Sequence, residues 1–360
     1  MEKKKHIWWK ILLGVVGAVL LIVIAYLLYV ILTYNRIEDK QPIEVNSTAQ
    51  SEQAEVGKTY TAVTYNIGFG AYTPDFTFFM DGGTQSWANS KESVERCVDG
   101  VADTALNKNP DIVLYQEVDT DSTRSYHVNE ADQIRSHYSG FNDVFAVNYH
   151  SAFLMYPFTQ PHGASNSGLL TLSDMKITSA TRRSFPISTG FSKFLDLDRC
   201  FSVSHIPTDN GKELVLYNVH ASAYGVDAEI QHAQFEMLFE DMKSEYDKGN
   251  YVVCGGDFNH DFTGNSKEKL NKVVDSEHTW AAPFPDDLMP EGFEKQTDYK
   301  NGELIATTRN CDIPYSEDSF TVILDGFITS DNVKVKSVEN IQTDFEFSDH
   351  NPVVMEFELK

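Results

Sequence analysis

Polar residues that could carry out phosphate chemistry follow several apolar segments of this chain. They are Asn66, Glu117, His220, Asp257 with Asn259, Asp325, and Asp349 with His350. Hydrolysis of a phosphodiester needs a hard cation on a phosphate oxygen, an activated water and a proton for the leaving oxygen. Carboxylate and carboxamide oxygens are suitable ligands for Mg²⁺, and histidines fixed by carboxylates can move protons near neutral pH. These residue types therefore predict metal-assisted hydrolysis of a phosphoester.

Other hydrolytic chemistries lack their usual residues here. The sequence has no paired His or Cys spacing typical of a zinc site, and no Ser or Cys in a nucleophile elbow. Direct attack by water is the simpler interpretation. A single Asp or Asn after a strand is ordinarily a turn former or a helix cap, so the prediction depends on the whole series.

Apolar and β-branched runs indicate the strands that position these side chains. The runs cover residues 61–66, 111–117, 213–220, 251–256 and 320–325, and each ends at or just before a residue of the series. The run at 111–117 has too few polar positions for a half-exposed strand, which favours burial on both faces. We therefore expect the polar residues at the ends of strands in an α/β fold.

The motifs around these residues resemble one known superfamily. They are Tyr65-Asn66-Ile67, Gln116-Glu117-Val118, Asn218-Val219-His220, Gly256-Asp257-Phe258-Asn259, Leu324-Asp325-Gly326-Phe327-Ile328 and Ser348-Asp349-His350-Asn351-Pro352. The series is similar, in order, to that of the endonuclease/exonuclease/phosphatase superfamily, which includes DNase I, abasic-site endonucleases, neutral sphingomyelinases and inositol-polyphosphate 5-phosphatases. The resemblance spans roughly residues 60 to 360 and implies a four-layer α/β sandwich.

The resemblance also implies a role for each residue. Asn66, Glu117 and Asp349 would hold the metal, with Mg²⁺ expected and Mn²⁺ as an alternative. Asp257 and Asn259 would orient the attacking water and the phosphate. His350, held by Asp325, would contact the scissile phosphate or transfer a proton, and His220 would lie across the phosphorus from it. The abasic-site branch has a tyrosine where His220 stands, which makes that branch the less fitting one. Which histidine acts as acid and which as base stays open.

For several other polar residues the sequence gives weaker support for a role in the site. His260 follows Asn259 and is expected to be a solvated loop residue, with a supporting role as the alternative. Arg124 and His127 could contact phosphate, but a surface loop is the default expectation. Asn166 lies where the superfamily often has a Gly-Asn-Ala strand start, in a different order here. The remaining histidines are expected to be structural or exposed: His137, His150, His162, His205, His232 and His278.

Two helices and one unusual loop complete the expected catalytic region. Residues 90–106 and 228–246 have helical patterns, and Asn109-Pro110 should stop the first of them. Asp209-Asn210-Gly211 is typical of a hairpin turn. Residues 72–83 are longer and more aromatic than the connection expected there, so they either form a wall of the substrate cleft or pack under their own aromatics.

The N-terminal region predicts a membrane anchor. Residues 11–33 are uncharged and mainly apolar, and at about 1.5 Å per residue they can cross a hydrocarbon core of about 30 Å. Lysines at positions 3, 4, 5 and 10 precede this run. The positive-inside rule then leaves residues 1–10 as a cytoplasmic tail and the C-terminal domain outside a cell membrane crossed once. A cleaved signal peptide is the alternative, although its apolar region is usually shorter.

Two further segments follow the anchor. Residues 34–58 have little apolar content and are expected to form a flexible stalk. Residues 59–360 would form the catalytic domain, and neither an internal repeat nor a second low-complexity linker interrupts them.

Charge restricts the substrate. The formal net charge is −24, and without residues 1–35, which hold four lysines and one glutamate, it is −27. Such a domain should repel nucleic acid unless cations screen it. A lipid headgroup or a small phosphodiester is therefore at least as fitting a substrate as DNA or RNA, an extracellular nuclease remains the alternative, and a non-catalytic surface binding module is the alternative of another class. No protein partner is predicted.

The cysteines leave their redox state open. Cys97, Cys200, Cys254 and Cys311 would face an oxidising compartment, and four cysteines allow three full pairings. Cys254 lies in an apolar run and is expected to be a buried thiol, which argues against a complete disulfide framework.

Overall fold

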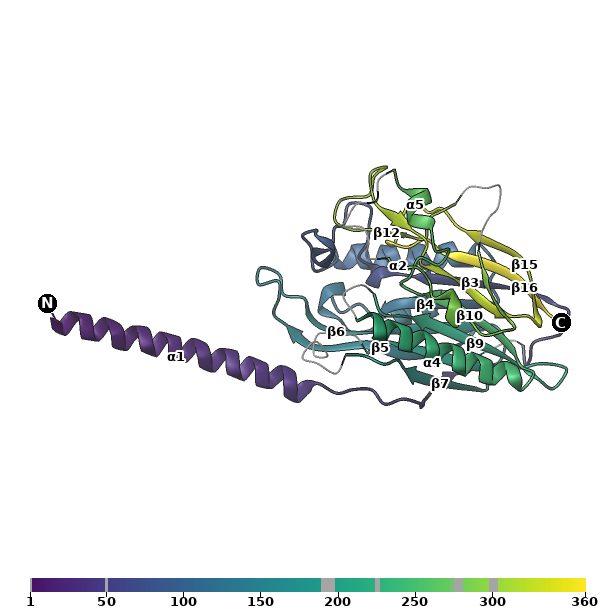
Figure 1. Ribbon diagram of the computed structural model, residues 1–360, viewed down its shortest axis with the longest axis horizontal. Helices are drawn as coiled ribbons and strands as arrows, with labels where there is room; N and C mark the ends of the chain where they lie inside the picture. The colour runs from purple at the N-terminus through teal and green to yellow at the C-terminus, as the bar shows by residue number, and fades with distance from the viewer. Residues whose placement is uncertain are drawn as a thin grey trace.

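Two large sheets form the centre of the molecule in the computed structural model (Figure 1). The structure describes residues 2–48, 51–188, 198–223, 227–272, 274, 281–297 and 304–360. In the described residues the first sheet has the order β1 (Gln41–Ile43), β7 (Ser179–Ser184), β8 (Cys200–Pro207), β9 (Glu213–His220), β10 (Tyr251–Asp257), β14 (Asp325–Ser330) and β11 (Phe293–Gln296). The second has the order β15 (Val333–Asn340), β16 (Val353–Leu359), β3 (Thr59–Asn66), β4 (Ile112–Asp119), β6 (Gly163–Ser173), β5 (Asn142–Leu154) and β2 (Val45–Asn46). A short pair, β12 (Thr308–Arg309) and β13 (Thr321–Val322), lies beside them.

The two sheets pack face to face, and helices cover their outer faces. Successive side chains of a strand point to opposite faces. On β4, Ile112 and Leu114 therefore pack against the other sheet, whereas Val113 and Tyr115 pack against helices. This burial on both faces explains why the run lacks polar positions. The result is the four-layer sandwich that the motifs imply.

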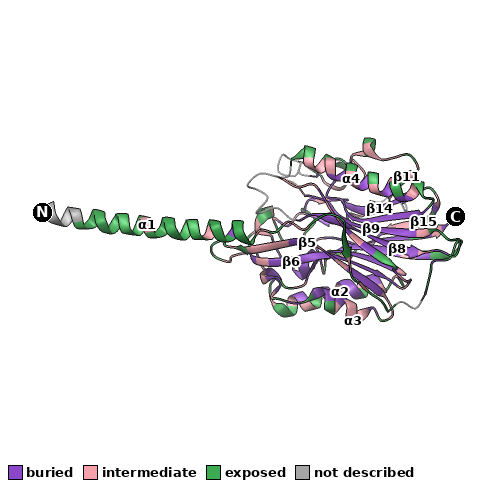
Figure 2. Cartoon of the chain, turned by 90° about the horizontal axis from the view of Figure 1, so that it is seen from below, coloured by how far each residue is buried: buried purple, intermediate pink, exposed green. Residues whose placement is uncertain are grey.

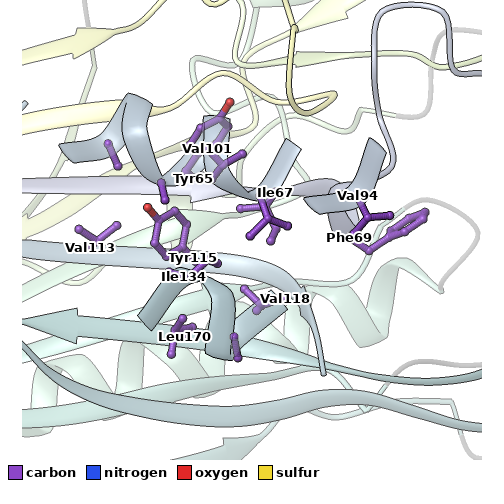
Figure 3. Packing of buried hydrophobic residues seen from close by; sticks show 14 of the residues in the cluster. Tyr65, Ile67, Phe69, Val94, Val101, Val113, Tyr115, Val118, Ile134 and Leu170 are labelled. Atoms are coloured by element: carbon purple, nitrogen blue, oxygen red, sulfur yellow. The ribbon is translucent and has the colours of Figure 1, made fainter. Parts of the chain in front are cut away.

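The helix layers lie on opposite sides of the sheets (Figure 2). Helices α2 (Lys91–Leu106) and α3 (Glu130–His137) cover the second sheet. Figure 3 shows Val101 of α2 by Tyr65, Val94 of α2 by Phe69, and Ile134 of α3 by Tyr115. Helix α4 (Ala228–Asp247) covers the first sheet, and α5 (Ser266–Leu270) is short.

The predicted helix ends agree with the structure. Ser90 caps α2 by accepting a hydrogen bond from the backbone N–H of Ser93. After α2 the chain turns at Asn109, whose φ of 49° is left-handed, immediately before Pro110. The turn at 209–211 joins β8 to β9, where the Gly211 N–H donates to the Thr208 carbonyl.

The N-terminal helix α1 (Glu2–Thr33) extends away from the sandwich (Figure 1). Within its portion Ile7–Thr33, a stretch of 18 residues has a mean hydropathy of 3.0, and the portion is long and apolar enough to cross a membrane, a test that a signal sequence also passes.

The segment after α1 differs from the expected flexible stalk. Residues 41–43 pair with β7 of one sheet, and residues 45–46 pair with β5 of the other. Arg36 forms an ion pair with Asp198 at 2.6 Å. Low apolar content does not predict these contacts, because an edge strand needs only backbone pairing and tolerates Pro42.

All four cysteines are buried thiols without disulfide bonds. The expectation for Cys254 is therefore confirmed, and none of the three pairings is present.

Candidate active site

Asp257 lies at the centre of the site because of strand register. It ends β10, directly beside His220 at the end of β9 and Asp325 at the start of β14. The sequence pattern placed Asp325 at the end of a strand over 320–325, and this detail is wrong. Those residues divide into β13 and the first residue of β14. Because β14 runs antiparallel to β10, its first residue lies at the same edge as the last residue of β10.

The second sheet contributes two residues to the same edge. Asn66 ends β3, and its side-chain N–H donates to Asp257 Oδ2 at 3.0 Å and to Glu117 Oε1 at 3.4 Å. Glu117 lies in a bulge of β4 with φ of 57°. A bulge redirects a side chain that would otherwise alternate with its neighbours. The amide of Asn66 thus connects acidic groups from both sheets.

His350 forms a short hydrogen-bonded chain with Asp325. Its Nδ1 lies 2.8 Å from Asp325 Oδ2 and 3.1 Å from Thr308 Oγ1, and its Nε2 lies 3.8 Å from Asp257 Oδ2. Burial opposes a charge on this imidazole, but the carboxylates of Asp325 and Asp349 raise the pKa of His350 to about 10. Such a histidine is cationic at neutral pH, with Nε2–H as its free donor.

His220 has the opposite charge state. Asn148 donates its amide N–H to His220 Nδ1 at 3.2 Å, and Nε2 lies 3.4 Å from Asp257 Oδ2. Burial lowers the pKa of His220 well below its ordinary value, and the positive charges of Arg199 and His350 add to this shift. A neutral imidazole and an imidazolium therefore lie on either side of one carboxylate.

Asp257 is held by its own loop. The Asn259 N–H donates to Asp257 Oδ1 at 2.8 Å, and the left-handed φ of 51° at Asn259 makes this tight turn. Burial raises the pKa of Asp257 to about 6, with a further increase from Asp325 and a decrease from His350. A carboxylate with a pKa near neutrality is suited to accept a proton from water.

Asn66, Glu117 and Asp349 are the residues predicted to hold a cation, and Glu117 and Asp349 both line the cleft. Burial raises the pKa of Asp349 to about 7, and the charge of Glu117 adds to this rise. The Nδ2 of Asn66 faces Glu117, whereas its Oδ1 accepts from the Gly68 N–H at 3.0 Å. The oxygens that suit Mg²⁺ as they stand are therefore those of the two carboxylates. Gly68 leaves room for this arrangement, since a Cβ there would lie 2.6 Å from Asp349 Oδ1.

A second group could also hold a cation. Donor atoms of Asp257, Asp325 and His350 all lie within 4.8 Å of one another. In this group the Nδ1 of His350 is already engaged with Asp325, so its arrangement suits proton transfer as well as coordination.

The site opens into a large cleft with a volume of about 1190 Å³. Its floor includes Glu117, His220, Asp257, Asn259, Asp349 and His350. Arg124, Arg199 and Arg309 also line it, so cationic side chains lie in the cleft beside its carboxylates.

Comparison with known proteins identifies the family. A model described as the Endonuclease/Exonuclease/phosphatase family matches residues 63–350. The chain belongs to this family. It is accordingly a hydrolase that acts on phosphoester bonds. No curated protein matches the sequence.

Solved structures of the family share the fold. The chain is similar to an endonuclease/exonuclease/phosphatase from Beutenbergia cavernae, with a TM-score of 0.56, 15% identity, and coverage of 84% of this chain and 72% of that one. It is also similar to ANGEL2, a 2',3'-cyclic phosphatase in complex with adenosine-2',3'-vanadate, with a TM-score of 0.55, 14% identity, and coverage of 88% and 98%. It is similar as well to the human Nocturnin catalytic domain, with a TM-score of 0.54, 14% identity, and coverage of 88% of this chain and 98% of that one.

Residues 72–83 both form a wall of the cleft and pack under their own aromatic side chains. Phe78, Phe79 and Met80 line the cleft. Tyr72 also packs edge-to-face on Phe76 at 4.8 Å between ring centroids. The segment is therefore a cleft wall that its own aromatic side chains hold in place.

Arg124 is buried, contrary to the default expectation of a surface loop. It makes two hydrogen bonds to Asp119, at 2.9 and 3.0 Å, and its guanidinium lies 3.8 Å from the ring centroid of Phe69. Because these contacts fix the guanidinium at the cleft, Arg124 can present a positive charge to a phosphate. His127, by contrast, is exposed and pairs with Asp121.

Two other expectations need correction or restriction. His260 is buried against Phe235, with Nδ1 2.9 Å from the Phe258 carbonyl, so it is not a solvated loop residue. Asn166 donates to Thr120 and does not line the cleft, whereas its neighbour Ser167 does. His162 also lines the cleft, where burial lowers its pKa to about 4. His278 lies outside the described residues.

Sequence reasoning missed three polar residues of the site. Asn148 fixes the orientation of His220, Thr308 contacts both Asp325 and His350, and Arg309 lines the cleft beside Asp349. Asn148 lies inside a long strand, and the strand that holds Thr308 and Arg309 is only two residues long. Neither position ends an apolar run, so the sequence pattern gave no signal for them.

Proposed function

We propose that this chain is a membrane-anchored, outward-facing, Mg²⁺-dependent phosphodiesterase whose substrate is a lipid headgroup or a small phosphodiester. The observation that carries the proposal is the meeting of strand ends from both sheets at Asp257. Asn66 and two histidines of opposite charge state surround that carboxylate, and the other two candidate metal ligands, Glu117 and Asp349, line the same cleft. A binding module has no need for this combination.

Asn66, Glu117 and Asp349 are the proposed ligands of the cation. When bound, Mg²⁺ would neutralise charge on a phosphate oxygen. Asn66 also donates to Asp257, so one carboxamide links the proposed metal ligands to the water-orienting group. The Nε2 side of His350 and the guanidinium of Arg124 provide positive charge for the remaining phosphate oxygens.

Asp257 and Asn259 would orient the attacking water, and Asp257 would accept its proton. His350 is cationic and can donate from Nε2 to an oxygen of the phosphate. His220 is neutral, and with Nδ1 engaged by Asn148 it carries its proton on Nε2. This distribution favours His350 as the donor and leaves His220 to stabilise the opposite side of the phosphate.

Membrane anchoring rests on the composition of the N-terminal region. Helix α1 is apolar over most of Ile7–Thr33, and four lysines lie at its N-terminal end, against Arg36 and Lys40 after its C-terminal end. The positive-inside rule then directs the catalytic domain outward. Since the chain after residue 35 has a charge of −27, anionic nucleic acid is disfavoured and a phosphoester at the membrane surface is favoured.

Hydrolysis assays on the full-length chain in nanodiscs test the proposal. The substrates are bis-p-nitrophenyl phosphate, plasmid DNA and a choline phospholipid, each with and without Mg²⁺. We expect Mg²⁺-dependent turnover that His350→Ala abolishes. The control is His232→Ala, since His232 is an exposed histidine of α4 that pairs with Glu236. Preferred cleavage of DNA would instead support the nuclease alternative, and no turnover of any substrate would contradict the proposal.

A further inference from the structure

The hairpin between β5 and β6 has an exposed apolar tip. Its exposed side chains are Phe153 (40% exposed), Met155 (44%), Tyr156 (64%) and Phe158 (82%). Among the described residues after α1, the other exposed large apolar side chains are Val56, Met80 and Ile313. Exposed apolar surface on the catalytic domain is thus concentrated at one hairpin. We call residues 153–158 the hairpin tip.

The sequence around the hairpin tip carries no formal charge. Between Asp143 and Asp174 there is no Asp, Glu, Lys or Arg, although the chain as a whole contains 53 acidic and 29 basic residues. A charge-free stretch of this length can approach a lipid phase without the cost of desolvating a charged side chain.

The hairpin tip is hydrogen-bonded to the membrane-spanning portion of α1. The Tyr26 hydroxyl donates to the Phe153 carbonyl at 3.3 Å and accepts from the Met155 N–H at 3.2 Å. The Tyr29 hydroxyl accepts from the Phe153 N–H at 3.1 Å. Figure 2 shows β5 and β6 extending from the sandwich toward α1.

These hydrogen bonds indicate how deep the hairpin tip lies along α1, and how its backbone groups remain paired in lipid. Tyr26 precedes Thr33, the last residue of α1, by seven positions, so the contact lies about 10 Å along the helix from its outer end. In lipid, backbone polar groups must find partners within the protein. The two tyrosine hydroxyls satisfy the outermost backbone groups of β5, which would otherwise be exposed to lipid.

The same hairpin forms part of the cleft rim. Leu154 and Tyr156 line the cleft together with Phe79 and Met80, and the rings of Tyr156 and Phe79 lie 5.9 Å apart. The cleft therefore has an apolar rim beside α1, whereas its floor holds the carboxylates and histidines.

We propose that the hairpin tip inserts into the outer leaflet beside α1, so that the cleft opens onto the bilayer. The inference rests on the proposed function and narrows its substrate to a lipid phosphoester. The headgroup would reach the floor residues while the acyl chains stay near the apolar rim.

Insertion depth is measured by spin labelling of the full-length chain in phosphatidylcholine nanodiscs. A nitroxide at Phe158→Cys is compared with one at Val56→Cys, because Val56 is exposed next to the C-terminal strand. The native cysteines are buried and should not react. We expect the label at 158 to be accessible to oxygen and protected from a water-soluble nickel chelate, and the label at 56 to show the reverse. Equal aqueous accessibility of both labels would overturn the inference.

Substrate access is measured with the double variant Met155→Ser/Phe158→Ser, since neither residue lines the cleft. We expect about a tenfold loss in hydrolysis of bilayer phospholipid with an unchanged rate on bis-p-nitrophenyl phosphate, and no effect of Val56→Ser on either rate. A double variant that hydrolyses both substrates at the wild-type rates would overturn the inference and leave the proposed function intact. Failure of the wild-type chain on both substrates, with the label at 158 inserted, would overturn the proposed function alone.

Discussion

At the scale of single residues, neighbouring side chains determine which ring nitrogens of the two site histidines carry protons. Asp325 binds Nδ1 of His350, and Asn148 binds Nδ1 of His220. The charge of Asp325 raises the pKa of His350, whereas burial lowers the pKa of His220, so the two imidazoles have pKa values on opposite sides of neutrality. The donor role proposed for His350 follows from its contact with Asp325.

Asp325→Asn should move the alkaline limit of activity to lower pH. In the wild-type fold the carboxylates of Asp325 and Asp349 raise the pKa of His350 to about 10, so its cationic form persists up to that pH. Without the Asp325 charge, the imidazolium should lose its proton at a lower pH, and kcat/KM should fall about 10²-fold or more at neutral pH. The measurement is the pH profile of kcat/KM on a soluble diester. An unmoved alkaline limb would contradict the assignment.

Asp174→Asn should stabilise the protein at neutral pH only. Burial and the charge of Asp111 raise the pKa of Asp174 from 3.8 to about 6, and its Oδ1 has no hydrogen-bond partner. The charged form therefore destabilises the fold above about pH 6, and this cost disappears below pH 3.8. Because Asp174 is partly exposed, we expect a gain of about 1 kcal/mol at pH 7.5.

The test of Asp174→Asn is thermal unfolding followed by circular dichroism at two pH values. We expect the variant to melt about 2 °C above the wild type at pH 7.5 and at the same temperature at pH 3.8. A gain of equal size at both pH values would show that the charge of Asp174 is not its cause.

Most residues of the site could be predicted from sequence because each stands at the end of a strongly apolar run or in a specific motif. Asn148 and Thr308 could not, since their roles depend on which strands become neighbours in space. The burial of His260 was mispredicted for a similar reason. Its environment is the ring of Phe235, contributed by α4, which no local pattern around His260 indicates.

At the scale of elements, strand ends from both sheets must stay aligned for the site to exist. Gln116 of β4 and Asn218 of β9 form a buried bridge between the sheets, with Gln116 Nε2 donating to Asn218 Oδ1 at 2.8 Å. Both residues directly border the site, because Gln116 precedes Glu117 and Asn218 lies two positions before His220. The bridge holds the two edges in register.

Gln116→Leu should destabilise the protein by about 1–3 kcal/mol, because the buried Oδ1 of Asn218 loses its donor. Asn218→Leu should have a similar cost for the amide group of Gln116. The double substitution should cost less than the sum, since neither partner then remains unpaired. Urea unfolding of the four proteins in detergent measures this coupling, and strict additivity would show that the bridge contributes nothing.

The elements themselves were partly predictable. The runs ending at Asn66, Glu117 and His220 gave the central strands, because strands buried on both faces need continuous apolar sequence. The edge strands at 41–43 and 45–46 were taken for a flexible stalk, since pairing at a sheet edge is a backbone interaction and leaves little trace in side chains. The antiparallel direction of β14 depends on tertiary context in the same way.

At the scale of the whole molecule, the four layers bring polar strand ends into one cleft, and α1 lies beside the rim of that cleft. The acidic charge of the domain disfavours nucleic acid, while the arginines at the cleft allow a single phosphate group to bind. Each layer can be anticipated from sequence periodicity. The contact between α1 and the hairpin tip cannot, because it involves backbone groups of β5.

The central claim is that Asn66, Glu117 and Asp349 create a divalent-cation site that drives phosphoester hydrolysis. The most direct test is a Mg²⁺ titration of bis-p-nitrophenyl phosphate hydrolysis by the wild type, Glu117→Gln and the control Glu294→Gln, whose parent residue is exposed on β11. We predict no activity after chelation, and restoration by Mg²⁺ in the wild type and the control. In Glu117→Gln the rate should be lower by about 10²-fold or more, even at high Mg²⁺. Full activity of Glu117→Gln, or activity that survives chelation, would contradict the claim.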